Sequence, residues 1–154
     1  MEIDDLITPA SVIANLRAAN KRQALQELAR RAASIAALDE RKVYDALWER
    51  EQLGTTGIGS GAAVPHGRLA ELQRPTALFA RLEKPIEFDA IDSQPVDLIF
   101  LLLTPSAAGA DHLKALALIS RLLRNRAMCA KLRAMDSADA IYAFLIDRAA
   151  SHAA

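Results

Sequence analysis

An uninterrupted apolar run, Leu98–Leu103, constrains the fold more than any other feature of this chain. It forms the core of a strand-like segment, residues 95–103, which Thr104-Pro105 ends. A strand without alternating polar residues is typical of a central position in a sheet that is covered on both faces. The run is too short to cross a bilayer as a helix, which takes about 20 residues. We therefore expect a central buried strand and no membrane insertion.

Helix signals precede this strand. Asn20 is a good N-cap, and Gln23 stands where a capping-box partner belongs. Asp39 is placed to cap a second helix, residues 40–53, which Gly54 would end. In the first helix the apolar residues recur at the spacing of one helical face, namely Leu25, Leu28, Ala29, Ala32 and Ile35.

The remaining segments predict the fold class. Residues 76–82 and 96–103 are joined by a short connection, which favours an antiparallel pair within the sheet. Helices precede, interrupt and follow the strands, so the chain is predicted to be α/β, a single-domain sandwich with helices on both faces of a mixed sheet of five strands or a similar number. The other expected elements are strands at 11–18 and 86–89 and helices at 110–124, 126–135 and 138–149, the last capped by Ser137.

Composition narrows the function. A chain of 154 residues suggests one domain, residues 1–154, large enough to bury roughly 68–70% of its surface. Its 19 basic and 19 acidic side chains balance, so no nucleic-acid partner is expected. The single cysteine, Cys129, is interpreted as a small buried residue. The acidic start lacks the charge pattern of a signal peptide, which predicts a cytoplasmic protein.

A glycine-rich segment, Gly54–Gly61, invites a phosphate-loop interpretation that fails on detail. No lysine follows Gly61, and the dinucleotide fingerprint needs a strand before it and a helix after it, whereas here a helix precedes it. The histidines and Cys129 lack the close spacing of metal ligands. The nucleophile elbow of serine hydrolases is also missing. The chain is therefore expected to use neither a cofactor nor a metal.

The segment that follows, Val64-Pro65-His66-Gly67-Arg68, holds one of only three histidines. A neutral imidazole has one lone pair for attack and one N–H that an acceptor can hold, and its usual pKa of about 6.5 lies near neutrality. Pro65 restricts the backbone before the ring, and Gly67 removes bulk where a tetrahedral group would approach. Arg68 offers a fork of donors for phosphate oxygens. The alternative is a histidine in an ordinary turn.

Two further residues are candidates for the same pocket. His112 lies in the first turn of the predicted helix 110–124, on its inward face, where free backbone N–H groups attract anions. The alternative is a core histidine whose hydrogen bonds are satisfied. Arg50 lies at the edge of the buried stripe of helix 40–53, and its alternative is a surface salt bridge of little energetic value. The residues alone leave both alternatives open.

The segment Thr55–Arg68 resembles the active-site segment of the mannitol/fructose-type EIIA domains of the bacterial phosphoenolpyruvate-dependent phosphotransferase system. Within that family it is most similar to the nitrogen-regulatory, PtsN-type branch. Three neighbouring segments fit the same pattern, and the resemblance extends over about residues 6–147. These segments are Arg50–Gly54, Pro85–Asp92 and Pro95–Leu98.

The resemblance implies a role for each candidate. His66 matches the phosphorylated histidine, His112 the second active-site histidine and Arg50 the active-site arginine. Arg68 stands where the family carries a basic residue, and we expect it to bind phosphate. The implied function is that of a phosphoryl-accepting regulator, phosphorylated on His66 by the histidine phosphocarrier protein of the nitrogen branch. Its implied downstream partners are regulatory proteins such as transporters or kinases. The alternative is a binding module of the same fold that regulates partners without phosphoryl transfer.

Overall fold

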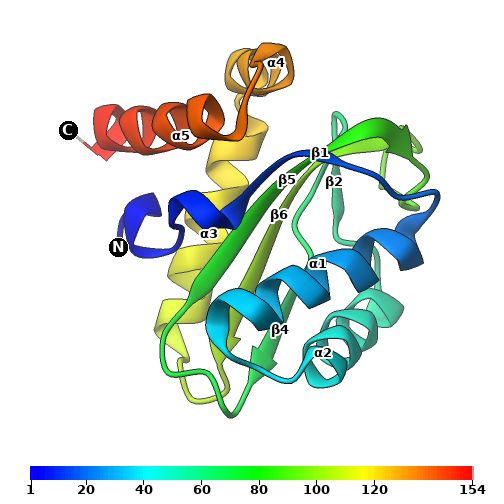
Figure 1. Ribbon diagram of the computed structural model, residues 1–154, viewed down its shortest axis with the longest axis vertical. Coiled ribbons are helices and arrows are strands. Elements are labelled where there is room, and N and C mark those ends of the chain that lie inside the picture. The colour runs from blue at the N-terminus through cyan, green and yellow to red at the C-terminus, as the bar shows by residue number, and fades with distance from the viewer. Residues whose placement is uncertain (154) are drawn as a thin grey trace.

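The computed structural model describes the backbone of residues 1–153 and the side-chain surroundings of residues 1–147. Figure 1 shows a sheet with helices on both sides, and its elements in chain order are η1 (Ile3–Asp5), η2 (Pro9–Ser11), β1 (Val12–Leu16), α1 (Lys21–Ala36), α2 (Glu40–Leu53), β2 (Gly57–Gly59), β3 (Ala62–Ala63), β4 (His66–Leu69), β5 (Thr76–Ile86), β6 (Val96–Pro105), α3 (Ala110–Arg124), α4 (Arg126–Ala134) and α5 (Ala138–Ala153).

The sheet of the described residues is mixed and has six strands. Their order is β1-β5-β6-β3-β2, and β4 pairs with β6 as well. β5 and β6 run antiparallel, with Phe79 opposite Phe100, whereas β3 and β4 run parallel to β6. The predicted fold class and the antiparallel pair are thereby confirmed, and the sheet contains one strand more than the five expected.

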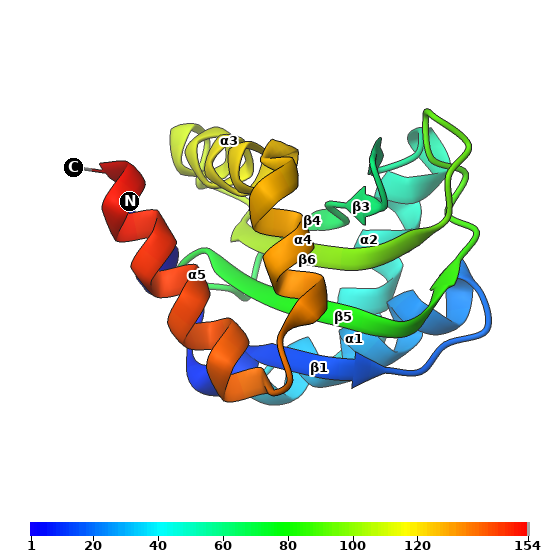
Figure 2. The same cartoon turned by 90° about the horizontal axis from the view of Figure 1, so that it is seen from above.

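Both faces of the sheet are covered. Helices α1 and α2 lie against one face, and α3, α4 and α5 lie against the other (Figures 1 and 2). The apolar run of β6 serves both layers because successive side chains of a strand point to opposite faces. Leu98, Phe100 and Leu102 pack toward the α3–α5 side, and Ile99, Leu101 and Leu103 pack toward α1 and α2.

The predicted helix caps are present. Asn20 Oδ1 accepts the Gln23 N–H at 2.9 Å, and Gln23 Oε1 reaches back to the Ala19 N–H, one residue before the cap. Asp39 and Ser137 cap α2 and α5 through their side-chain oxygens. Local hydrogen bonds of this kind depend only on neighbouring residues, which is why the helix starts were predictable. The end of α5 lies four residues beyond the predicted position 149.

Other expectations need correction. The predicted strand at 86–89 is wrong, because β5 continues to Ile86 and residues 87–89 lie in the following loop. Phe88 is fully buried against the α1–α2 side, so its apolar character reflects packing of the loop. β6 extends past the expected end to Pro105, because β4 pairs with it there. The segment between Gly57 and Leu69 contains three short strands where none had been assigned.

A break in one sheet edge positions the functional candidates. β3 and β4 pair in succession with the same side of β6, Ala63 opposite Ile99 and then His66 opposite Leu102. The connecting backbone is held by hydrogen bonds from Val64 N to Thr56 O and from Leu102 N to Pro65 O, each 2.9 Å long. His66 is therefore the first residue of a strand that restarts after the break. No helix in the described part of the chain combines the length and apolarity needed to cross a membrane.

Candidate functional site

The imidazole of His66 is held through both ring nitrogens. Its Nδ1 lies 2.9 Å from the carbonyl oxygen of Val64, and its Nε2 lies 3.2 Å from Nε of Arg50. A carbonyl oxygen only accepts and a guanidinium only donates. Nδ1 therefore carries the proton and Nε2 presents its lone pair, so the ring is in the neutral Nδ1–H tautomer.

The electrostatics of the site favour the same state. Partial burial lowers the pKa of His66 from its usual value, the hydrogen bond to Val64 opposes this effect, and the charge of Arg50 lowers the pKa further. A lowered pKa keeps the ring neutral at pH 7. Arg50 is itself fixed, because its Nη1 donates to Gly54 O at 2.8 Å just beyond the end of α2.

His112 lies beside His66. The two ring centroids are 5.6 Å apart, and the ring planes are inclined by 58°. His112 is only 6% exposed, and its Nδ1 lies 2.5 Å from the hydroxyl of Thr104, the residue that follows the apolar run. Burial lowers the pKa of His112, and the charge of Arg68 lowers it further. The ring is buried and hydrogen-bonded, as a core histidine would be, and it also lines the cavity described next.

All four residues singled out from the sequence border one cavity of about 390 Å³. Arg50 comes from the last turn of α2, His66 and Arg68 from β4, and His112 from the first turn of α3. The lining is completed by Ala46, Glu49, Leu53 and Gly67. Leu53 is 82% exposed, which gives the cavity an apolar rim.

Gly67 has a packing reason that its sequence context did not reveal. A Cβ built on Gly67 would lie 3.1 Å from the Cβ of Ala46 on α2. This distance is tight for two carbon atoms. The close approach of α2 to β4 therefore disfavours a side chain at position 67, in addition to any benefit for an approaching ligand.

Sequence reasoning missed two buried polar residues close to the candidate site. One is Thr104, which holds His112. The other is Glu51, whose carboxylate accepts hydrogen bonds from the backbone N–H and the hydroxyl of Thr56. A signal for Glu51 was present, because it continues the buried stripe of Val43 and Leu47 at intervals of four residues. An acidic residue on an apolar stripe indicates a buried partner.

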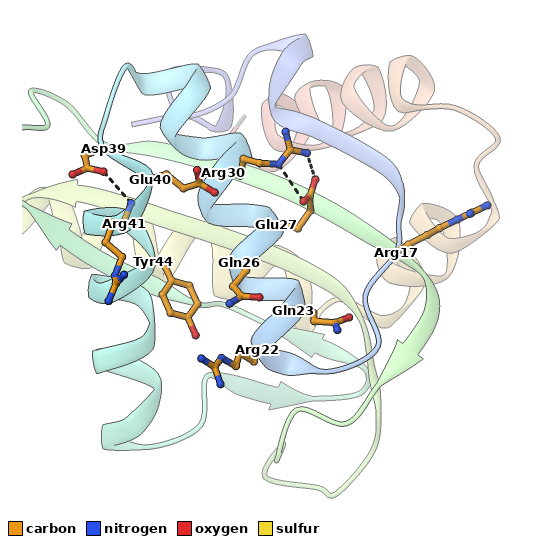
Figure 3. Close-up of a pocket in the computed structure, with 10 residues that line it drawn as sticks. All are labelled: Arg17, Arg22, Gln23, Gln26, Glu27, Arg30, Asp39, Glu40, Arg41 and Tyr44. Carbon is orange, nitrogen blue, oxygen red and sulfur yellow. Dashed lines mark hydrogen bonds and ion pairs between the residues drawn. The ribbon is translucent and has the colours of Figure 1, made fainter.

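A larger hollow lies elsewhere, between α1 and α2 (Figure 3). It contains none of the four sequence candidates, and several of its charges are neutralised by neighbouring side chains: Arg30 pairs with Glu27, Arg41 with Asp45 and Arg17 with Glu83. We therefore place the candidate site in the cavity around His66 and not in this larger hollow. Among the described residues, no group of three or more His, Cys, Asp or Glu side chains is arranged to hold a metal ion.

Comparison with solved structures defines the class of protein. The nitrogen regulatory protein IIA-Ntr of Neisseria meningitidis matches 93% of this chain and 98% of its own, with a TM-score of 0.88 and 31% sequence identity. IIA mannitol of Escherichia coli shares the fold, with a TM-score of 0.77 over 90% of this chain and 98% of its own, at 18% identity. The fold is thus that of the IIA components of phosphotransferase systems.

The sequence places the chain within this class. It belongs to the family described as phosphoenolpyruvate-dependent sugar phosphotransferase system, EIIA 2, whose model matches residues 5–148. A nitrogen regulatory protein of Bradyrhizobium diazoefficiens is 53% identical over 145 residues, 94% of this chain and 95% of the relative. A nitrogen regulatory protein of Escherichia coli is 42% identical over 129 residues, 83% and 79% of the two chains. The family resemblance inferred from the segment Thr55–Arg68 is confirmed.

Proposed function

We propose that this protein accepts a phosphoryl group on Nε2 of His66 from a phosphohistidine of a phosphocarrier protein and regulates other proteins through its phosphorylation state. The observation that carries the proposal is the neutral ring of His66, with Nδ1 bound to Val64 O and Nε2 facing a cation. Membership of the EIIA 2 family and similarity to nitrogen regulatory proteins support it.

The transfer exchanges one nitrogen–phosphorus bond for another. The lone pair on Nε2 of His66 attacks phosphorus, the bond to the carrier's imidazole breaks, and that imidazole keeps the electron pair. Such transfers pass through a loose, in-line transition state in which the protein mainly positions groups and neutralises charge. Because the Nε2 lone pair accepts the hydrogen bond from Nε of Arg50, the guanidinium turns away as Nε2 attacks and donates to a phosphoryl oxygen instead. His112 and Arg68, which border the same cavity, supply further donors.

Docking of the carrier uses the apolar rim of the cavity. Leu53 is 82% exposed, and Leu113, which follows His112, is 64% exposed. We take these two exposed aliphatic side chains as part of the surface that the carrier contacts. One structure that shares the fold at 17% identity is a complex of enzyme IIA mannitol with phosphorylated enzyme IIB mannitol. A comparable contact through the His66 face suits a protein that receives phosphate from one partner and signals to another.

The decisive experiment is phosphorylation in vitro. The chain is incubated with phosphoenolpyruvate, enzyme I and the phosphocarrier of the nitrogen branch, and its mass is measured before and after acid treatment. We expect an acid-labile gain of one phosphoryl group that His66→Ala abolishes and His152→Ala, which removes the third histidine, retains. Absence of the gain while a control EIIA protein is modified would reject phosphoryl acceptance and leave the binding module.

A further inference from the structure

The carboxylate of Glu51, in the last turn of α2, is buried close to the candidate site. Glu51 is 5% exposed, and its oxygens accept the Thr56 N–H at 3.0 Å and the Thr56 hydroxyl at 2.5 Å. The ammonium group of Lys21 lies 2.8 Å from the same carboxylate. We infer that Glu51 is a positioning residue that fixes the orientation and the tautomer of His66. The inference rests on the proposed function insofar as this tautomer serves phosphoryl acceptance.

A short series of hydrogen bonds links Glu51 to the imidazole. The carboxylate holds Thr56, the carbonyl oxygen of Thr56 accepts the Val64 N–H at 2.9 Å, and the carbonyl oxygen of Val64 accepts Nδ1–H of His66 at 2.9 Å. Each bond fixes the backbone group that makes the next one. Displacement of Thr56 would therefore move the acceptor on which the Nδ1–H tautomer depends.

The same residue anchors the other side of the ring. Glu51 follows Arg50 in the last turn of α2, so the carboxylate that grips Thr56 also fixes the end of the helix from which the Arg50 guanidinium reaches Nε2. Glu51 thus helps to fix both groups that hold the ring, the Val64 carbonyl at Nδ1 and the Arg50 guanidinium at Nε2. Preorganisation of this kind matters because small misplacements of reacting groups slow transfer strongly.

Placing a carboxylate here is costly, which indicates that its function is specific. The C-terminal end of a helix carries partial negative charge, so an acidic residue in the last turn is unfavourable. Burial of the charge adds a further cost that hydrogen bonds and an ion pair must offset. Lys21 provides the ion pair, and its ammonium group also lies 4.9 Å from the ring centroid of Phe88 and 3.3 Å from Asp89. An apolar residue at position 51 would fill the stripe without these costs.

The test measures the tautomer and the transfer rate separately. In the Glu51→Gln variant the ring of His66 is expected to populate both tautomers, seen in two-bond ¹H–¹⁵N spectra of histidine-labelled protein without any carrier. The rate of phosphoryl acceptance is expected to fall by about tenfold or more. Asp45→Asn, an exposed carboxylate-to-amide change on α2, serves as the matched control and should keep the wild-type tautomer and rate.

One outcome overturns the inference, and a second variant covers failure to fold. A Glu51→Gln protein that is merely less stable but retains the wild-type tautomer and rate shows a purely structural residue. If Glu51→Gln does not fold, the same measurements are made on Thr56→Val, which removes only the hydrogen bond from the Thr56 hydroxyl to Glu51. Wild-type tautomer and rate in that variant would equally reject the inference. If the wild-type chain accepts no phosphoryl group, the proposed function fails, and the carrier-free spectra alone still decide whether Glu51 sets the tautomer.

Discussion

His66 and His112 each use Nδ1 for a hydrogen bond to the protein, His66 to the carbonyl of Val64 and His112 to the hydroxyl of Thr104. Nδ1 is thus occupied in both rings, and Nε2 of His66 accepts the hydrogen bond from Arg50. The rings approach to 5.6 Å between centroids without stacking, and each lines the same cavity. Each of these contacts involves a different residue, so single substitutions can test them separately.

His66 should become protonated at a lower pH than an ordinary histidine. Because burial and the charge of Arg50 lower its pKa from 6.5, the ring stays neutral as pH falls to 6.5 and takes up a proton only at lower pH. Phosphoryl acceptance, which needs the lone pair, should decline in that lower range. Titration of the Cε1–H resonance of His66 gives the pKa directly, and a midpoint at or above 6.5 would contradict the prediction.

Arg50→Gln should move two quantities in opposite directions. Removing the cation raises the pKa of His66, since the guanidinium disfavours a second positive charge nearby. It also removes a donor to the phosphoryl group, which should slow acceptance on the order of 10²-fold. The pKa is read by NMR and the rate by quenched mass measurements. Arg41→Gln, an exposed arginine on the same helix, should change neither; an unchanged rate in Arg50→Gln would refute its role.

His112→Ala should slow phosphoryl acceptance and lower stability together. Loss of the ring leaves the buried Thr104 hydroxyl without this partner, which costs about 1–3 kcal/mol of unfolding free energy. Urea denaturation measures that loss, and calorimetry should give an unchanged Kd for the carrier because the rim is intact. A variant that is destabilised but accepts phosphoryl at the wild-type rate would show that His112 is only a core residue.

Gly67→Ala should destabilise the protein through a clash with Ala46. The added Cβ would lie 3.1 Å from the Ala46 Cβ, and overpacking of this kind costs about 1–3 kcal/mol. The double variant with Ala46→Gly should recover part of that loss, although glycine within a helix costs about 1 kcal/mol by itself. A double-mutant cycle of unfolding free energies measures the coupling. A coupling of zero would mean that Gly67 is needed for another reason.

Leu53→Asp should weaken carrier binding without affecting the fold. The side chain is 82% exposed on the rim, so a charge there disturbs docking but no core contact. We expect Kd to rise by about tenfold, equivalent to about 1.4 kcal/mol. Ala10→Asp, which adds the same charge beside β1 at the other edge of the sheet, is the control. Equal affinities for both variants would place the docking surface elsewhere.

Much of the fold followed from local signals. Asn20, Asp39 and Ser137 mark helix starts because their side chains bond to backbone groups within three residues. The apolar run of β6 indicated a doubly covered strand. The short strands β2, β3 and β4 gave no periodic signal, because two to four residues are too few to show one and tertiary pairing with β6 defines two of them. Phe88 led to the wrong strand prediction at 86–89, because its apolar side chain is buried from a loop and not from a strand.

The sequence predicted which residues would form the candidate site, but not how they are arranged. The Pro65–Gly67 context singled out His66, and each of His66, Arg50 and His112 had a structural alternative; only the fold showed that the three border one cavity. Glu51 and Thr104 were missed because their significance lies in partners that only the tertiary structure supplies. The assignments of His66, His112, Arg50 and Arg68 as functional residues remain predictions for the experiments above.

The break between β3 and β4 has a consequence for solubility. In the described part of the chain the two longest strands, β5 and β6, lie inside the sheet, while its borders are formed by β1, β2 and β4, none longer than five residues. Exposed borders that are long and flat invite strands of other molecules to add to them, and short interrupted ones do not. The interruption that brings His66 to the cavity thus also keeps the strand at this border short, which disfavours edge-to-edge pairing with strands of other molecules.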